Sequence, residues 1–418
     1  MNRIVRKPLG VPVRIAARLV VRLLTGLAAA SLPLSTLAEQ QTWLFSGYVS
    51  GQARYFWEEP LDPYQSSSDV SIAARPEAYR EWNGGRDSFN AILFGRWDQR
   101  DDERTHFDIQ EFKWQHVGSD WELRVGADIV FWGVAESVHL VDIINQTDVV
   151  ENIDGEDKLG QPMVNLSLIR DWGTLNLFVL PGFREQTYPG PEGRPRVHPP
   201  VNGDAAVFES DAGDEHVDLA LRWSHMIGNW DIGLSYFDGT TRDPRFGFEI
   251  DEAAGTAFLF PIYEQIGQAG VDVQFTWESW LLKLEAIRRT GQLEPFNAAV
   301  GGFEYTLYGL FNGVTDLGLV GEYLYDGAPV ETRSPFESDV FTGLRFTLND
   351  AQSTEALAGC IFDLDSSSRF CSIEASRRFG SHWVGSAEVR TFSSIPEPDP
   401  FYTLRRDDYI QLELAYYF

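Results

Sequence analysis

After its N-terminal region, the sequence lacks any apolar run long enough to form a transmembrane helix. From residue 39 onward, no stretch reaches the roughly 18 uninterrupted apolar residues that such a helix needs. Basic residues are also scarce, because 34 Lys and Arg stand against 62 Asp and Glu, giving a net charge of −28. This balance argues against a nucleic-acid partner, which requires a basic surface.

Signatures of common enzymes are missing as well. The seven histidines form no His-Glu-x-x-His pair, and two cysteines alone cannot supply a thiolate zinc cluster. No Gly-x-Ser-x-Gly elbow or phosphate-binding loop occurs. His216 lies beside Asp214 and Glu215, but a polar cluster at a loop end explains this group better than a catalytic pair. We therefore predict no enzymatic activity, no cofactor and no metal.

What the sequence does contain begins with an export signal. Residues 1–38 hold six basic residues and no acidic one, include an apolar run at 23–34, and end in Thr36-Leu37-Ala38. This pattern is typical of a secretory signal peptide cleaved after Ala38, and its apolar run is too short to span a bilayer. A retained membrane anchor is the alternative. Losing six basic residues would change the net charge from −28 to −34 in the mature chain, 39–418.

The final ten residues alternate between apolar and polar side chains, which predicts a strand with one apolar face. A soluble β-protein could end on such a strand. In an outer-membrane β-barrel, however, the apolar face meets lipid and aromatic residues lie at the membrane–water boundary. Tyr416 and the terminal Phe418 also resemble the sorting signal that such barrels present to the barrel-insertion machinery.

The same alternation recurs along the whole mature chain. We predict an all-β fold, a transmembrane antiparallel up-and-down β-barrel of about 18 strands. Sixteen strands remain possible because Pro76 interrupts the second one. The alternation slips at Gln110-Glu111, which predicts a β-bulge. The predicted strands are 43–57, 69–81, 87–98, 105–117, 120–132, 162–170, 174–184, 214–226, 230–245, 258–277, 280–292, 297–311, 315–327, 337–348, 353–364, 367–378, 382–394 and 405–418.

Loop lengths support a barrel independently of the strand count. Joins after even-numbered strands are short turns such as Gly84-Gly85, whereas long joins such as 133–160 and 185–213 follow odd-numbered strands. A bacterial single-chain barrel has short periplasmic turns, longer external loops and an even number of strands. We therefore expect both termini in the periplasm of a Gram-negative bacterium, with 185–213 as an external loop.

The spacing of the two cysteines agrees with the predicted strands. Ten residues separate Cys360 from Cys371, and a two-residue turn at Asp365-Ser366 would place them opposite each other on adjacent strands. Cross-strand spacing suits a disulfide in a non-hydrogen-bonded pair, and an exported protein meets an oxidising compartment. The alternative is two reduced cysteines that face lipid.

Inward-facing residues would line an aqueous lumen, because a barrel of this size is wide enough to hold one. Charged residues are costly on the lipid face, so their alternation assigns them to the inside. Their signs are mixed. The lumen-wall candidates are Arg124, Arg222, Glu122, Asp128, Lys283, Arg345 and Arg390.

The stretch 133–160 lacks the alternation of apolar and polar residues that marks the predicted strands. Its apolar patches at 138–141 and 143–144 would let it fold back and narrow the pore, where its acids would favour cations. Alternatively, it is an external cap, and acidic external loops could bind divalent cations that bridge lipopolysaccharide phosphates. The candidates for the constriction are Glu136, Asp142, Asp148, Glu151 and Asp154.

One segment resembles a known family. Trp121–Gly133, followed by Asp142–Asp148, is similar to porin-like outer-membrane proteins of Gram-negative bacteria, among them the alginate-export channels and their uncharacterised relatives. Those proteins show an Arg-Leu-Gly-Arg-Gln-type strand, a Trp-Gly end and then an Asn-Pro-x-Asp loop. Here Ala127-Asp128 replaces the Arg-Gln pair, and Gln146 replaces the proline. Alginate exporters carry a strongly basic lumen for an anionic polymer, whereas this chain is acidic with a mixed lumen.

These observations predict an outer-membrane channel for passive or facilitated diffusion of small solutes. A closed barrel with a structural or surface-binding role is the first alternative, and an outer-membrane enzyme is the second. The expected partners are outer-membrane lipid, lipopolysaccharide, the barrel-insertion machinery and a small solute whose identity the sequence does not give.

Overall fold

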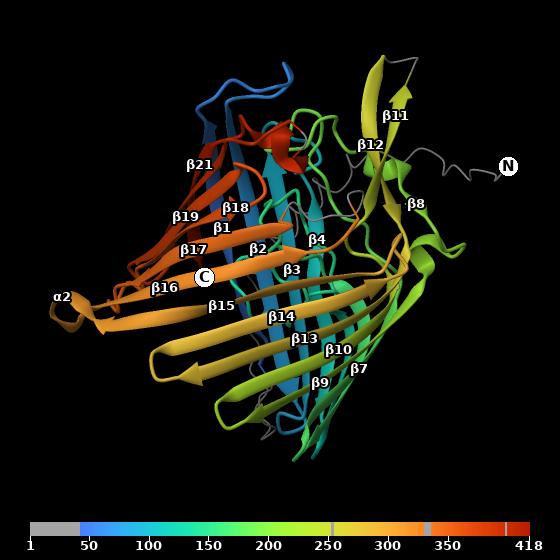
Figure 1. The fold of residues 1–418 in the computed structure, drawn as a ribbon. Helices are drawn as coiled ribbons and strands as arrows, with labels where there is room; N and C mark the ends of the chain where they lie inside the picture. The colour runs from blue at the N-terminus through green and yellow to red at the C-terminus, as the bar shows by residue number, and fades with distance from the viewer. Residues whose placement is uncertain (1–41, 252–254, 330–335, 398) are drawn as a thin grey trace, which may run out of the picture. The chain divides into compact units, whose positions relative to one another are not determined.

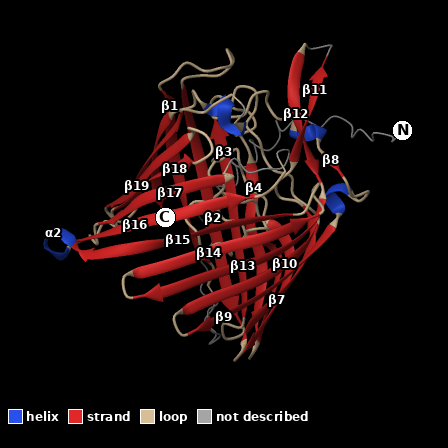
Figure 2. Ribbon diagram, viewed as in Figure 1, coloured by secondary structure: helices blue, strands red, loops and turns tan. Residues whose placement is uncertain are grey.

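A computed structural model describes residues 42–251, 255–329, 336–397 and 399–418, so the predicted signal peptide, 1–38, lies outside the described residues. Within the described residues, eighteen antiparallel strands form one closed β-barrel, because each pairs with the next and the last pairs with the first (Figures 1 and 2). The predicted 18-stranded all-β barrel is therefore confirmed. The barrel strands are β1 (Leu44–Phe56), β2 (Ser68–Trp82), β3 (Asp87–Asp98), β4 (Phe107–Val117), β5 (Trp121–Asp128), β6 (Gln161–Arg170), β7 (Gly173–Pro181), β9 (Val217–Ile227), β10 (Trp230–Thr240), β13 (Gln265–Trp277), β14 (Trp280–Thr290), β15 (Phe296–Gly309), β16 (Thr315–Asp326), β17 (Ser338–Thr347), β18 (Glu355–Asp363), β19 (Arg369–Phe379), β20 (Trp383–Ser393) and β21 (Tyr409–Tyr417).

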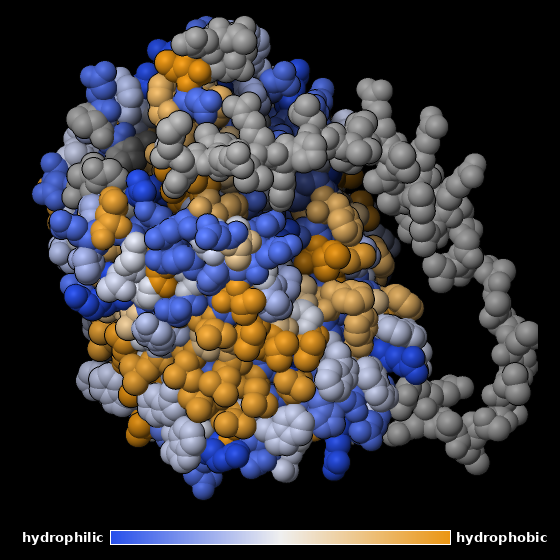
Figure 3. Space-filling model, turned by 90° about the vertical axis from the view of Figure 1, so that its right-hand side faces the viewer, coloured by the Kyte–Doolittle hydropathy of each residue, from blue (hydrophilic) through white to orange (hydrophobic). Residues whose placement is uncertain are grey.

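The strand alternation sorts side chains between the outside and the lumen. On β21, Leu412 and Leu414 face outward and are about half exposed. Between them in sequence, Glu413 accepts a hydrogen bond from Gln52 of β1 at 3.2 Å inside the barrel. Figure 3 shows apolar side chains gathered in a broad patch on one outer face of the barrel. An outer apolar belt with a polar interior is the pattern of a transmembrane barrel.

Pro76 does not end β2, although it interrupts the ladder. It lies opposite Gly47 of β1, and the ladder to β3 runs from Ala74–Gly95 to Glu77–Ile92 without a pair at Pro76 itself. Proline lacks an N–H, so the gap falls where no donor is available. The predicted bulge is also present, because Ile92 pairs with Glu111 whereas Leu93 pairs with residue 109, which leaves Gln110 as the extra residue.

The joins at the two ends of the barrel differ in length. The short-turn rim, where even-numbered barrel strands end, has joins such as 171–172, 228–229 and 278–279. The long-loop rim, at the opposite end, has joins that include 129–160 and 182–216. This sorting agrees with the loop lengths expected from the sequence.

Some predicted strand ranges were too long: 120–132 and 405–418 shorten to β5 and β21, and two others extend beyond the barrel. The alternation at 230–245 and 258–277 predicts two barrel strands, but β10 ends at Thr240 and β13 begins at Gln265. The residues between contribute β11 (Arg245–Asp251) and β12 (Thr256–Tyr263), which form a separate three-stranded sheet with β8 (Val207–Phe208). A period of two fits any half-buried strand, so it does not distinguish a barrel strand from a strand within a long loop. In Figure 1 the β11–β12 hairpin projects beyond the barrel strands.

Helical structure is sparse in the described residues. It consists of the 3₁₀ turns η1 (Gly203–Ala205), η2 (Gly213–Glu215) and η3 (Pro400–Leu404), and the single turn α2 (Leu310–Gly313). Among the residues that the structure describes, no helix is long and apolar enough to cross a membrane.

Candidate constriction in the barrel lumen

The join 129–160, here called the inserted loop, folds into the barrel. Val141, Ile143 and Ile144 are almost fully buried. They belong to one apolar cluster with inward-facing residues of the wall, such as Phe178 of β7 and Ile287 of β14. Burial of these side chains from water holds the loop against the inside of the barrel. The loop is therefore a lumenal element and does not form an external cap.

Two wall carboxylates hold the first half of the inserted loop. Glu285 of β14 accepts hydrogen bonds from the N–H groups of Val134 at 2.6 Å and Ala135 at 2.8 Å. Glu322 of β16 accepts from the N–H groups of Glu136 at 2.8 Å and Ser137 at 2.9 Å. Hydrogen bonds to ionised acceptors are about twice as strong as neutral ones. The two carboxylates thus supply acceptors to a backbone that has no strand partner there. The partners of these two carboxylates lie about 150 to 190 residues away in sequence, so no local pattern pointed to these contacts.

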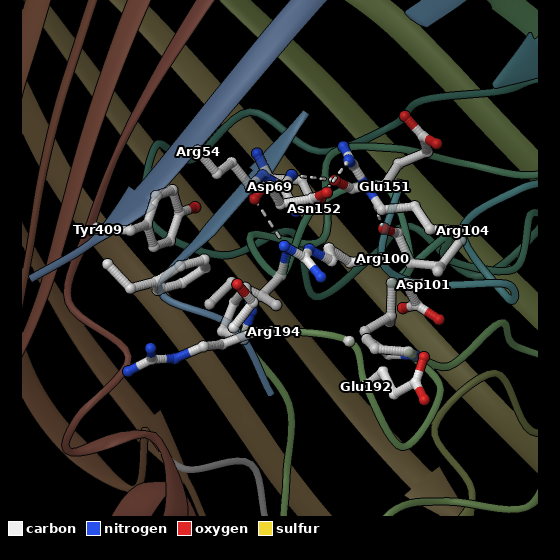
Figure 4. Close-up of a pocket in the computed structure, with 18 residues that line it drawn as sticks. Arg54, Asp69, Arg100, Asp101, Arg104, Glu151, Asn152, Glu192, Arg194 and Tyr409 are labelled. Atoms are coloured by element: carbon white, nitrogen blue, oxygen red, sulfur yellow. Dashed lines mark hydrogen bonds and ion pairs between the residues drawn. The ribbon is translucent and has the colours of Figure 1, made fainter. Parts of the chain in front are cut away.

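The second half of the loop is held by arginines. Arg96 of β3 forms an ion pair with Glu151, with Nη2 2.8 Å from Oε2. Arg54 of β1 donates to the carbonyl oxygen of Glu151 at 2.8 Å, and Arg104 donates to that of Val150 at 3.1 Å. Figure 4 shows Arg54 and Arg104 on either side of Glu151, around a small cavity. Burial would raise the pKa of Glu151, but the guanidinium groups of Arg96 and Arg104 outweigh burial and lower it.

Three of the five predicted constriction acids lie in closed contacts away from the open lumen. Asp142 accepts hydrogen bonds from the N–H groups of Trp132 and Gly133 and so closes a turn. Asp148 accepts from the hydroxyl of Thr187 at 2.6 Å. Glu151 is bound as described above. These three acids contact protein groups and do not form part of an acidic ring around a pore.

The other two, Glu136 and Asp154, reach open space. A cavity of about 700 Å³ lies between the inserted loop and the wall of β17 to β21, and both acids line it. Glu136 binds Arg345 at 2.6 Å and Lys283 at 3.4 Å. Asp154 binds Arg390 at 2.7 Å. These contacts pin the loop to the wall while leaving the cavity beside it.

The predicted wall residues also fall into two groups, those at the open cavity and those paired with each other within the wall. Arg345 and Arg390 line the open cavity, and Lys283 reaches its edge through Glu136. On the other side of the lumen, charges are paired within the wall. Arg222 forms a bidentate pair with Asp272 at 2.6 and 2.8 Å, Asp128 binds Lys113 at 2.5 Å, and Arg124 lies 3.6 Å from Glu122 and 3.9 Å from Asp128.

Two charged residues of the cavity, Glu374 and His139, are not among the predicted wall or constriction residues. Glu374 lies 3.1 Å from Arg390, which also contacts Glu388 at 2.5 Å and Asp154 at 2.7 Å. His139 of the inserted loop pairs with Glu156 at 2.9 Å and lies 3.8 Å from Glu285. Burial alone would lower the pKa of His139, but these two carboxylates raise it to about 10. The histidine therefore carries a positive charge in the lumen at neutral pH.

Cys360 and Cys371 are joined by a disulfide across β18 and β19. Their pairing register is the one expected from the sequence, although the hairpin join spans 364–368 and is longer than two residues. Cys360 shares a strand face with the exposed Phe362, and Cys371 shares one with the exposed Ile373, so the disulfide lies on the outer side of the hairpin.

His216 is part of a polar network at the long-loop rim. Its Nδ1 lies 2.8 Å from Asp218, whose other carboxylate oxygen binds Arg242 at 2.8 Å. Asp218 also accepts the N–H of Thr240 at 2.9 Å. These contacts fix the chain where β9 begins and β10 ends. Among the described residues, no group of three or more His, Cys, Asp or Glu side chains is arranged to hold a metal ion.

Sequence comparison finds no matching protein-family model and no matching curated protein. The fold does match solved structures. The crystal structure of Pseudomonas aeruginosa OccK3 (OpdO) aligns with a TM-score of 0.51 at 10% identity, covering 90% of this chain and 95% of that chain. A triple mutant of the Rhodopseudomonas blastica porin aligns with a TM-score of 0.44 at 13% identity, covering 90% of this chain and 100% of that chain. The likeness to OccK3 establishes a shared fold.

Proposed function

We propose that the protein is an outer-membrane channel through which small solutes diffuse, passively or with facilitation by wall contacts. The observation that carries this proposal is the cavity of about 700 Å³ beside the inserted loop, inside a closed 18-stranded barrel. A barrel of this size has room for water once its inward side chains line the wall. The inserted loop narrows that space without filling it, as a constriction in a diffusion channel would do.

The proposal includes a place and an orientation in the cell. The apolar outer face suits outer-membrane lipid, and the polar rims suit headgroups and water. Short turns suit the periplasmic side, so both ends of the barrel chain would be periplasmic and the long-loop rim would face lipopolysaccharide. Tyr416 and Phe418, both exposed at the short-turn rim, are the proposed sorting signal for the barrel-insertion machinery.

Kinship with the alginate-export channels stays a prediction. The open cavity is lined by more carboxylates than cationic groups. Such a wall repels an anionic polymer, since like charges raise the energy of a polyanion in a narrow, poorly hydrated space. A different small solute suits this lumen better.

Single-channel recording in planar lipid bilayers tests the proposal. The purified mature protein should insert and give discrete conductance steps. A closed barrel with a structural or surface-binding role would insert without such steps, so protein that is folded and membrane-embedded but silent would contradict the channel. Folding can be checked separately by circular dichroism.

A further inference from the structure

The open cavity has an aromatic wall at its end nearest the long-loop rim. Phe336, Phe370 of β19 and Phe401 of η3 line it. Their rings form a compact group, with centroids 4.8 Å apart for Phe370 and Phe401, 5.8 Å for Phe336 and Phe370, and 5.7 Å for Phe336 and Phe401. Ile153 of the inserted loop packs against the same buried apolar cluster as Phe370 and Phe401. The cavity thus offers an apolar, π-rich surface beside water.

The remaining wall carries an excess of negative charge. The guanidinium of Arg390 forms ion pairs with three carboxylates, those of Asp154, Glu374 and Glu388. The side chain of Glu374 is still 48% exposed, so part of it faces the cavity. Across the whole lining, six carboxylates stand against two arginines and His139; the acids are Glu136, Asp154, Glu156, Glu355, Glu374 and Glu388.

The aromatic wall and the carboxylates lie at a distance that one small molecule can span. Phe370 and Glu374 are on the same face of β19, four residues apart, which corresponds to about 13 Å along a strand. Arg390 of β20 pairs with Ser372, between them, and its guanidinium binds both Glu374 and Asp154, so these two carboxylates gather around one cation below the aromatic wall.

We propose that this cavity binds organic cations that carry an apolar or aromatic body, with the body against Phe336, Phe370 and Phe401 and the cation among Asp154, Glu156 and Glu374. Ring faces attract cations and apolar groups alike, and the carboxylate excess adds a sign preference. An anion of the same shape loses water without gaining a partner, because the arginines already bind carboxylates. The inference rests on the proposed channel, since it names the class of solute that the lumen selects.

Isothermal titration calorimetry on the full mature protein in detergent tests the proposal with three matched probes. 4-Phenylbutylammonium has both features, butylammonium lacks the ring, and 4-phenylbutyrate replaces the ammonium by a carboxylate. We expect 4-phenylbutylammonium to bind about tenfold or more tightly than butylammonium, a difference of about 1.4 kcal/mol, because only the former places a ring against the aromatic wall. 4-Phenylbutyrate should bind more weakly than either cation.

Variants separate the two parts of the site. Phe370→Ala should reduce the advantage of 4-phenylbutylammonium over butylammonium, and Phe370→Leu, which keeps an apolar side chain, should reduce it in part. Glu374→Gln should weaken both cations. Phe362→Ala, on the outer face of the neighbouring strand, is the matched control and should leave all three probes unchanged.

Tight binding of 4-phenylbutyrate would overturn the inference. So would an unchanged advantage of 4-phenylbutylammonium over butylammonium in both Phe370 variants. The assay needs no membrane current. Absence of conductance with normal cation binding would therefore count against the channel alone, whereas conductance without cation binding would count against this site alone.

Discussion

Arg96 of β3 and Glu151 of the inserted loop form a buried ion pair, with Nη2 2.8 Å from Oε2 and both side chains less than 10% exposed. The pair joins the barrel wall to a loop 55 residues further along the chain. Removing one partner would leave the other charged and buried, which typically costs about 3–5 kcal/mol.

We predict that Glu151→Gln destabilises the barrel by that order of free energy. Urea unfolding in lipid vesicles, followed by tryptophan fluorescence, measures the loss. Asp120→Asn breaks the ion pair of Asp120 with Arg170, whose side chains are 55% and 38% exposed, and is the control. An exposed pair contributes only about 0–1 kcal/mol. Equal losses in the two variants would contradict the anchoring role of Glu151.

The carboxylate of Glu322 should control how firmly the inserted loop narrows the lumen. Glu322→Gln removes the charge that binds the N–H groups of Glu136 and Ser137. We predict a larger and noisier single-channel conductance, because that segment would lie less tightly against β16. Glu304→Gln, on the adjacent β15 and in contact with Arg345 at 3.5 Å, is the control. Wild-type conductance in Glu322→Gln would show that the loop does not need this anchor.

Alkaline pH should loosen the same loop through His139. The pKa of His139 is raised to about 10, above the value of roughly 6.5 in an unfolded chain. Its charged form therefore stabilises the loop fully below about pH 6.5, and the stabilisation is lost as the pH rises through about 10. Conductance should change between about pH 8 and 11, and His139→Gln should remove that step. A pH profile that is identical in both proteins would refute this prediction.

The disulfide between Cys360 and Cys371 should stabilise the β18–β19 hairpin against unfolding. Non-reducing peptide mapping should recover one linked peptide pair, and reduction should lower the free energy of unfolding by about 2–3 kcal/mol, as expected for a short closed loop. The double variant Cys360→Ala and Cys371→Ala should match the reduced protein. Recovery of two free thiols from freshly purified protein would contradict the pairing.

The sequence predicted the barrel well because strand alternation and loop length can be read from short stretches of the chain. Alternation identified β21 and its apolar face, and the slip at Gln110-Glu111 located the bulge. Loop lengths sorted the two rims. The same alternation failed at 230–277, where Glu264 separates a loop strand from a barrel strand, because both kinds of strand are half buried.

The candidate site was less predictable because its partners are distant in sequence. The break at 133–160 pointed to the loop, and its acids were good candidates by composition alone. Their roles depend on which wall residue each one meets, such as Arg390 for Asp154, 236 residues away. No spacing rule relates such pairs, so the contacts of Glu285 and Glu322 with the inserted loop were not predicted.

The most direct test of a lumen that stays open beside the inserted loop is single-channel recording before and after thiol modification. Ser386 lines the cavity on β20, so Ser386→Cys allows a bulky methanethiosulfonate to be attached there. Leu344→Cys, at an exposed position on the outer face of β17, is the control. Modification should sharply reduce each conductance step of Ser386→Cys and leave the conductance steps of Leu344→Cys unchanged. Steps that are absent, or unchanged after full modification of Ser386→Cys, would contradict passage through this cavity.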